Sequence, residues 1–157
     1  MARSPHNIAH VLLPEGEGDA RYRNAATLFE SWLAEGALKQ DAEPSVYLLS
    51  QTFKGLDGQE LVRKGFLATA RLPERGESSF LDHERVFDKK VSDRLALTEH
   101  TRAQLGAVFV MYRDPDRELA SFYEVMDQRP EDMRAVTIDG VTQRVWKVPQ
   151  GLSLIHL

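Results

Sequence analysis

The densest group of potentially reactive side chains lies between residues 81 and 94, where carboxylate, imidazole, ammonium and guanidinium groups follow one another closely. His83 can exchange a proton near neutral pH, and Glu84 can act as a general base or hold a metal ion. A loop that leads into a helix also binds anions well, because unpaired backbone N–H groups point outwards there. His83 and Glu84 are therefore our candidate catalytic residues, and a solvated polar loop is the alternative interpretation.

A second polar group follows on the helix predicted over residues 91–104. Arg94 and Thr101 recur at a spacing that places them on one helical face, and Arg102 lies beside them. Two guanidinium groups about two turns apart can clamp a phosphate or a carboxylate. Surface ion pairs with neighbouring carboxylates are the alternative. We expect the ligand-binding residues to be Arg94, Thr101, Arg102, Arg85 and Asp93.

Composition and missing motifs exclude several classes of chemistry. The 157-residue chain has a net charge of −4 and no cysteine, so disulfides, thiolate nucleophiles and cysteine-bound zinc are excluded. Phe87 stands where the zinc-protease motif requires a second histidine after His83-Glu84. The chain also lacks a Walker A loop, a dinucleotide-binding glycine loop and a nucleophile elbow. We expect no metal site, and the acidic net charge disfavours nucleic acid as a partner.

The hydropathy pattern predicts where the protein is located. No apolar run reaches the ~20 residues that span a bilayer. Residues 1–6 lack the apolar stretch of a signal peptide. We therefore expect a cytoplasmic protein that does not enter the membrane.

Helices and strands that alternate along the chain must position these candidates. Periodicity and turn residues predict strands over residues 7–13, 45–53, 60–72, 107–112, 134–138 and 142–148. They predict helices over residues 20–35, 91–104 and 115–127. The Asp19 side chain is expected to cap the first of these helices, and Pro115 to open the third. We expect the inward-facing residues of the last helix to be Leu119, Phe122, Tyr123 and Met126.

The order of these elements predicts the fold class. Strands that follow one another with turn residues between them, as at Asp139-Gly140, predict hairpins. We expect an α+β fold with a mostly antiparallel sheet built from hairpins and about three helices. A single domain should cover residues 1–148.

Short motifs in a fixed order run along nearly the whole chain: Ser4-Pro5-His6-Asn7, Leu13-Pro14-Glu15-Gly16, Trp32-Leu33-Ala34-Glu35-Gly36, His83-Glu84-Arg85, Asp93-Arg94-Leu95, Thr101-Arg102-Ala103 and Asp139-Gly140-Val141. In this order they resemble the uncharacterised prokaryotic family called domain of unknown function 1015. Val86, Val91 and Gln104 stand where the family usually has Thr, Lys and Asn. A site that depends on those polar groups would be altered in this chain.

The resemblance implies that the chain is a segment of a longer protein and that residues 149–157 are a tail foreign to the family. Family members continue into an Ala-Asp-Gly-His-His-Arg stretch that is similar to the nucleotide-handling motif of ParB-like proteins and free serine kinases. The resemblance therefore implies part of a phosphotransfer enzyme that binds a phosphorylated ligand, with ATP or ADP and Mg in the full-length protein. A non-catalytic binding or regulatory module is the alternative. Where missing strands would normally complete the sheet, an exposed edge favours self-association.

Overall fold

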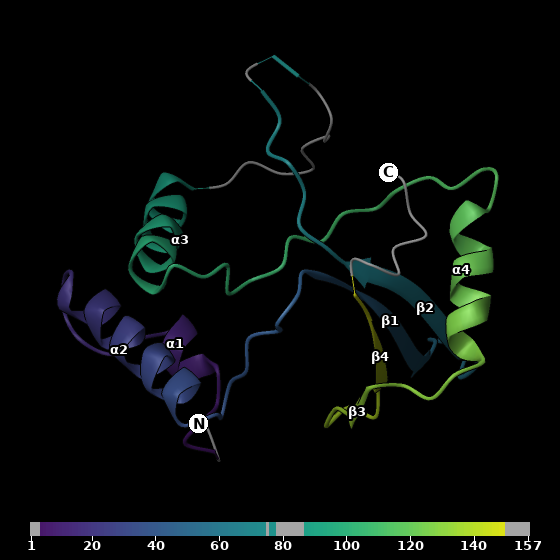
Figure 1. The fold of residues 1–157 in the computed structure, drawn as a ribbon, viewed down its shortest axis with the longest axis horizontal. Coiled ribbons are helices and arrows are strands. Elements are labelled where there is room, and N and C mark those ends of the chain that lie inside the picture. Colours follow the sequence, from purple (N-terminus) through teal and green to yellow (C-terminus); the bar gives the residue numbers. More distant parts are fainter. Residues whose placement is uncertain (1–3, 75, 78–86, 150–157) are drawn as a thin grey trace. The chain divides into compact units, whose positions relative to one another are not determined.

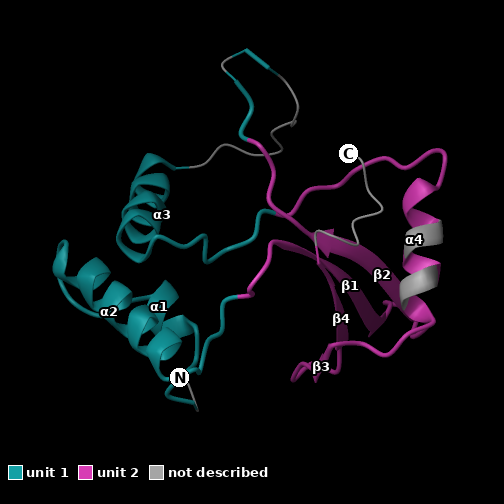
Figure 2. Cartoon of the chain, viewed as in Figure 1, with its two compact units in different colours: residues 1–40, 72–108 teal, residues 41–71, 109–157 magenta. Residues whose placement is uncertain are grey.

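The computed structural model describes residues 4–74, 76–77 and 87–149, drawn in Figure 1. The chain forms two compact units, one from residues 1–40 and 72–108 and the other from residues 41–71 and 109–157 (Figure 2). The first unit is helical and the second contains the sheet. Each unit has a hydrophobic core of its own.

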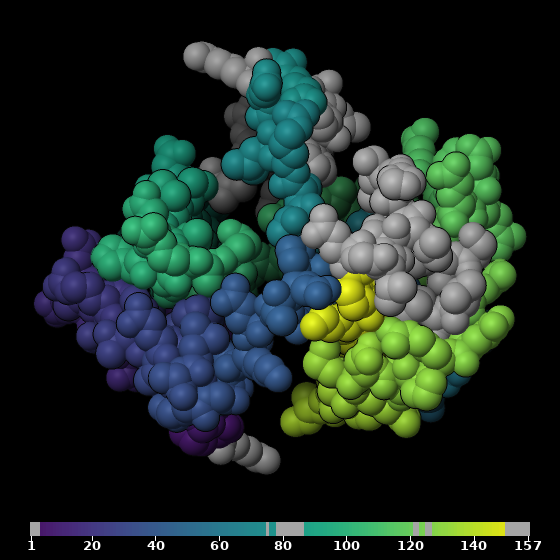
Figure 3. Space-filling view, in the orientation of Figure 1, coloured from purple at the N-terminus to yellow at the C-terminus, as the bar shows by residue number. Residues whose placement is uncertain are grey.

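Three helices build the first unit: α1 (Ala9–Leu12), α2 (Ala20–Ala34) and α3 (Asp88–Thr101). The aromatic and aliphatic residues of α2 recur at three- and four-residue steps, so they form one apolar stripe. That stripe packs against α1 and α3, and Figure 3 shows the side chains of α2 and α3 in direct contact. The buried side chains of this core are Val11, Tyr22, Ala25, Trp32 and Leu97.

The start of the first unit differs from the sequence prediction. The predicted strand over residues 7–13 is wrong, because this segment contains the single helical turn α1. The Asn7 side chain accepts a hydrogen bond from the backbone N–H of Ala9 at 2.9 Å, which favours the turn over an extended strand. The predicted side-chain cap of α2 is also wrong, since Asp19 contributes its backbone carbonyl instead.

The second unit is a four-stranded antiparallel sheet with the strand order β2-β1-β4-β3. The strands are β1 (Ser45–Lys54), β2 (Glu60–Leu67), β3 (Met133–Val136) and β4 (Thr142–Pro149). Both predicted hairpins are confirmed. Gly58 and Gly140 have positive φ values of 79° and 82°, which the turns require and glycine adopts without strain.

One face of the sheet is covered by α4 (Glu118–Asp127). The Asp114 carboxylate accepts hydrogen bonds from the backbone N–H groups of Glu118 and Leu119, so the helix begins later than the predicted Pro115. The predicted inward positions of Leu119 and Tyr123 are confirmed. Phe122 and Met126 are not among the residues whose side chains the structure describes. The core between helix and sheet contains Leu48, Tyr123, Trp146, Val148, Phe66 and Leu119.

The predicted buried strand over residues 107–112 is wrong. This segment joins no strand ladder, and Phe109 and Met111 are 72% and 86% exposed. The predicted α+β class with its antiparallel sheet is confirmed, with four helices in the described chain instead of about three. A single domain over residues 1–148 stays a prediction. None of the helices in the described ranges combines the length and apolar character that a membrane span needs.

Candidate functional site

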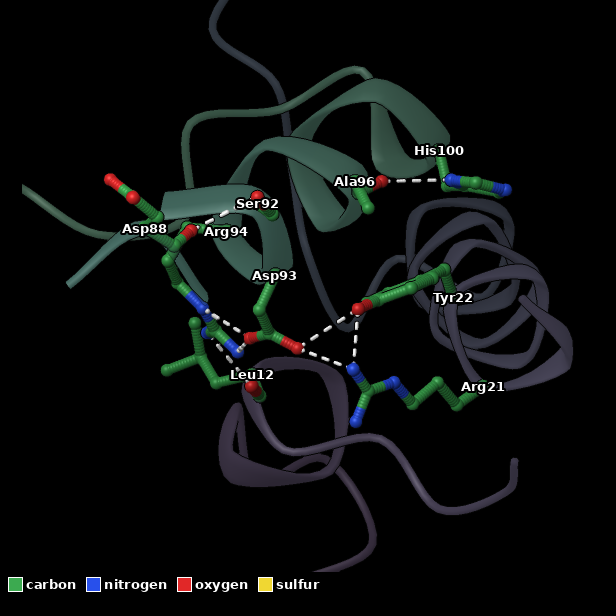
Figure 4. Close-up of polar contacts among 9 residues, drawn as sticks. All are labelled: Leu12, Arg21, Tyr22, Asp88, Ser92, Asp93, Arg94, Ala96 and His100. Atoms are coloured by element: carbon green, nitrogen blue, oxygen red, sulfur yellow. Dashed lines mark hydrogen bonds and ion pairs between the residues drawn. The ribbon is translucent and has the colours of Figure 1, made fainter. Parts of the chain in front are cut away.

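Asp93 lies at the centre of a polar cluster that joins the helices of the first unit (Figure 4). Its Oδ1 accepts hydrogen bonds from Arg21 Nη2 at 2.6 Å and from the Tyr22 hydroxyl at 2.9 Å. Its Oδ2 accepts from Arg94 through Nε at 2.9 Å and through Nη2. The carboxylate therefore has donors on both oxygens, and two of the donor groups carry positive charge.

This arrangement changes the proton affinity of Asp93. The hydrogen bond from Arg94 lowers the pKa of the Asp93 carboxyl below its usual value, and Tyr22 and the charge of Arg21 act in the same direction. Partial burial opposes them. Asp93 is therefore a firmly ionised anchor and a poor general base, because a carboxylate held in this way has little tendency to take up a proton.

Arg94 also reaches beyond Asp93. Its Nη1 donates a hydrogen bond to the backbone carbonyl of Leu12 at 3.0 Å, so one guanidinium connects α3 to the end of α1. The planar fork of arginine permits both contacts at once, which a lysine ammonium on the same backbone would not reproduce.

A stack of side chains lies next to the cluster. The Arg21 guanidinium carbon is 4.6 Å from the centre of the Tyr22 ring, and the His100 ring lies 5.6 Å from Tyr22 on centroids. His100 Nδ1 is 2.8 Å from the carbonyl oxygen of Ala96. Arg21 Nε is buried and has no hydrogen-bond partner within the described part of the chain. The Tyr22 ring thus holds the Arg21 guanidinium in place beside Asp93.

An open depression of about 770 Å³ lies over this cluster, with walls from α2 and the first half of α3. Its cationic side chains are Arg21, Lys89, Lys90 and Arg94, and its carboxylates are Asp19 and Asp93. Four positive groups against two negative groups leave the lining with an excess of two positive charges. In a chain of net charge −4, this is a locally basic surface.

Lys89 and Lys90 differ from the two arginines because no carboxylate among the described residues pairs with them. Both side chains are exposed in the first turn of α3, and neither forms an ion pair among the described residues. Lys90 Nζ lies 5.7 Å from the centre of the Phe87 ring. Phe87 precedes the helix without a capping side chain, and the backbone N–H groups of Asp88 and Lys89 have no partner among the described residues.

The structure brings only part of the predicted ligand-binding set together. Asp93 and Arg94 lie in the cluster. Thr101 and Arg102 lie at the other end of α3, about 10 Å along a helix that rises ~1.5 Å per residue. The Thr101 hydroxyl is buried and donates to the Leu97 carbonyl at 2.8 Å, while Arg102 follows the helix with a positive φ of 53°.

The other predicted site residues lie outside the described residues: His83, Glu84 and Arg85, together with the family departure Val86. Val91 lies on α3 but not in the lining of the depression, and Gln104 donates to the Gly106 carbonyl at 2.8 Å. Nowhere in the described ranges do three histidine or carboxylate side chains gather in a way that could hold a metal ion.

Sequence reasoning missed Arg21, Tyr22, Lys89 and Lys90 as parts of this site. Arg21 and Asp93 are 72 residues apart, so no local spacing connects them. The one available signal was the pair Lys89-Lys90 at the predicted start of a helix. Cations are unfavourable there, because the helix dipole is positive at the N-terminus, so two adjacent lysines suggest a binding role.

Comparisons with known proteins give one match. No curated protein and no solved structure matches the chain. The family model described as protein of unknown function (DUF1015) matches residues 1–156, nearly the whole chain. The chain therefore belongs to the DUF1015 family of proteins of unknown function.

Proposed function

We propose that the depression over α2 and α3 binds a small anionic ligand that carries a phosphate group. The ammonium groups of Lys89 and Lys90, which form no ion pair with any described residue, support this proposal most directly. Two exposed like charges in adjacent positions repel each other, and an anion between them and the helix N-terminus relieves that repulsion. Arg21, Asp93 and Arg94 line the same depression and are bonded to one another.

The Ala-Asp-Gly-His-His-Arg stretch of family members, which this chain does not contain and which is similar to the nucleotide-handling motif of ParB-like proteins and free serine kinases, leads to a proposed reaction class. In this proposal the chain is the ligand-binding part of a phosphotransfer enzyme that uses ATP or ADP with Mg. His83 and Glu84 are the candidate catalytic residues, because they precede α3 and its lysines by a few residues in the sequence. A binding or regulatory module without catalysis is the alternative, favoured by the structural engagement of Asp93 and Arg94.

For partners, we propose a small anion in preference to nucleic acid, because the basic lining is local and the chain as a whole is acidic. We also propose a cytoplasmic location, which rests on the sequence pattern alone.

Calorimetric titration with ATP, ADP and inorganic phosphate tests the binding proposal. The double variant Lys89→Ala/Lys90→Ala should weaken binding about tenfold or more, equivalent to about 1.4 kcal/mol at 25 °C. A matched control removes two other exposed cations of the first unit, Arg23 and Lys39, by substitution with alanine. Equal affinity in the lysine variant and the parent chain would reject the depression as the site.

A turnover assay distinguishes a phosphotransfer enzyme from a binding module without catalysis. The full-length protein should convert ATP or ADP in the presence of serine, and His83→Ala or Glu84→Ala should abolish that turnover while ligand binding persists. Binding without serine-dependent turnover would leave the binding module as the function and refute the phosphotransfer reaction.

A further inference from the structure

The sheet of the second unit has an open edge at β2. In the strand order β2-β1-β4-β3, β1 is the one described strand that pairs with β2. The Gly55 N–H bonds to the Gln59 carbonyl at the hairpin end, and ladder bonds alternate along antiparallel strands. The residues that bond to β1 are therefore Leu61, Arg63, Gly65 and Leu67. The backbone groups that point outwards from the edge belong to Glu60, Val62, Lys64 and Phe66.

An unpaired strand-forming segment lies in the same unit. Residues 109–112 have the sequence Phe-Val-Met-Tyr, in which every side chain is apolar or has a high strand propensity. All four residues are 47–86% exposed. Their backbone groups make no hydrogen bond within the described chain. Exposed backbone and exposed apolar side chains together are the properties of a strand that lacks a partner.

The chain's own β2 does not take up this segment. Tyr112 packs against Phe66 with ring centroids 5.6 Å apart, and its hydroxyl is 3.4 Å from that of Tyr123 on α4. These contacts fix one end of the segment on the face of the sheet that α4 covers, and no backbone bond joins it to the strand edge. Within the part of the chain that the structure describes, the β2 edge and residues 109–112 thus have no strand partner.

We propose that two copies of the chain associate by strand addition, with residues 109–112 of each copy pairing along the β2 edge of the other. A strand with apolar side chains on both sides suits this edge, because α4 covers one face there and the half-buried Tyr47 and Leu49 lie on the other. Reciprocal addition closes a symmetric dimer and covers part of each β2 edge. The edge strand β3 is shorter and offers fewer backbone groups.

Proline substitutions test each half of this contact. Val62→Pro removes an outward N–H without a cost to the β1 ladder, since proline is tolerated on edge strands. In the segment, neighbouring N–H groups point in opposite directions, so Val110→Pro/Met111→Pro removes at least one bonded group. The control is Ile138→Pro, at a fully exposed position in the β3–β4 turn where proline is favoured.

Analytical ultracentrifugation measures the outcome over a wide concentration range. The parent chain and Ile138→Pro should sediment as dimers, and the two proline variants should each sediment as monomers with unchanged circular dichroism. An equal mixture of Val62→Pro with Val110→Pro/Met111→Pro should recover weak dimers, because one intact edge and one intact segment remain.

Three outcomes would overturn the proposal. They are a monomeric parent chain, a dimer that survives both sets of proline substitutions, and a mixture that shows no recovery. Hydrogen exchange adds an independent measurement, because the amides of Val62 and Lys64 should become protected as the dimer forms. Protection of residues 109–112 in a monomer would show instead that the chain's own β2 binds the segment.

Discussion

Arg94 on α3 donates a hydrogen bond from Nη1 to the backbone carbonyl of Leu12, 82 residues away in the sequence and 3.0 Å away in the fold. The same guanidinium binds the Asp93 carboxylate. Arg94, which the sequence predicts to bind a ligand, therefore also connects α3 to α1. This double engagement makes Lys89 and Lys90, and not Arg94, the first cations that a ligand in the depression would meet.

Arg94→Lys should destabilise the first unit although it keeps the charge. An ammonium cannot donate to Asp93 and to the Leu12 carbonyl in the geometry of the guanidinium, so about 1–2 kcal/mol of unfolding free energy should be lost. Urea denaturation followed by tryptophan fluorescence, to which Trp32 of the first unit contributes, measures the effect. Arg102→Lys is the matched control, because Arg102 is exposed at the opposite end of α3 and should change stability little. Equal stability of both variants would contradict the role of the Leu12 contact.

Asp93→Asn should remove an acid-sensitive part of the stability, about 1–3 kcal/mol at neutral pH. The folded pKa of Asp93 is lowered, so its contribution is complete above the unfolded value of about 3.9 and is lost as the pH falls through the folded pKa. The stability difference between the parent chain and the variant should therefore shrink below pH ~4. Asp88→Asn, at the exposed start of α3, serves as control. A difference that stays constant down to the lowest pH would be inconsistent with the charged anchor.

Tyr123 should be the last tyrosine of the second unit to ionise in alkali. Burial raises the pKa of its hydroxyl above the usual value, with Tyr112 acting in the same direction. The neutral hydroxyl therefore contributes stability that is complete below the unfolded pKa of about 10 and is lost as the pH rises through the folded value. Ultraviolet titration of tyrosinate in Tyr123→Phe should lack the most alkaline step. A parent chain whose tyrosines all titrate together would disprove the burial effect.

Arg102→Gly should stabilise the first unit by about 0.5–1 kcal/mol, because a positive φ costs an L-residue about 1–2 kcal/mol and costs glycine nothing. Arg102 has a φ of 53° directly after α3. Arg102→Ala is the control, since it removes the guanidinium but keeps the strained backbone. A higher melting temperature for both variants would mean that the side chain, and not the backbone, is unfavourable.

Leu48→Ala should cost about 2–5 kcal/mol, the usual range for a leucine removed from a packed core. Leu48 is 1% exposed and packs with Trp146 between the sheet and α4. Leu56→Ala, in the exposed β1–β2 turn, should be nearly neutral. Thermal unfolding of the two variants measures the difference, and similar melting temperatures would contradict the assigned core.

The sequence by itself determined the elements that depend on local patterns. The stripe of Tyr22, Ala25 and Trp32 predicted α2, and glycine in two short turns predicted both hairpins, because periodicity and turn chemistry are properties of neighbouring residues. The pattern failed at residues 7–13, where an Asn7 side-chain bond favours a helical turn, and at 107–112, where an apolar run has no strand beside it. Strand formation requires a partner, which local sequence does not specify.

The tertiary structure decided the composition of the candidate site. Asp93 and Arg94 were visible in the sequence as a polar pair, but their partners Arg21, Tyr22 and Leu12 come from segments 71–82 residues away. Thr101 and Arg102 share the helix with them and still lie apart, because the rise of α3 separates its two ends. Side-chain type and helical spacing propose which residues can bind an anion. Only the packing of α1, α2 and α3 shows which charges are already neutralised and which remain available.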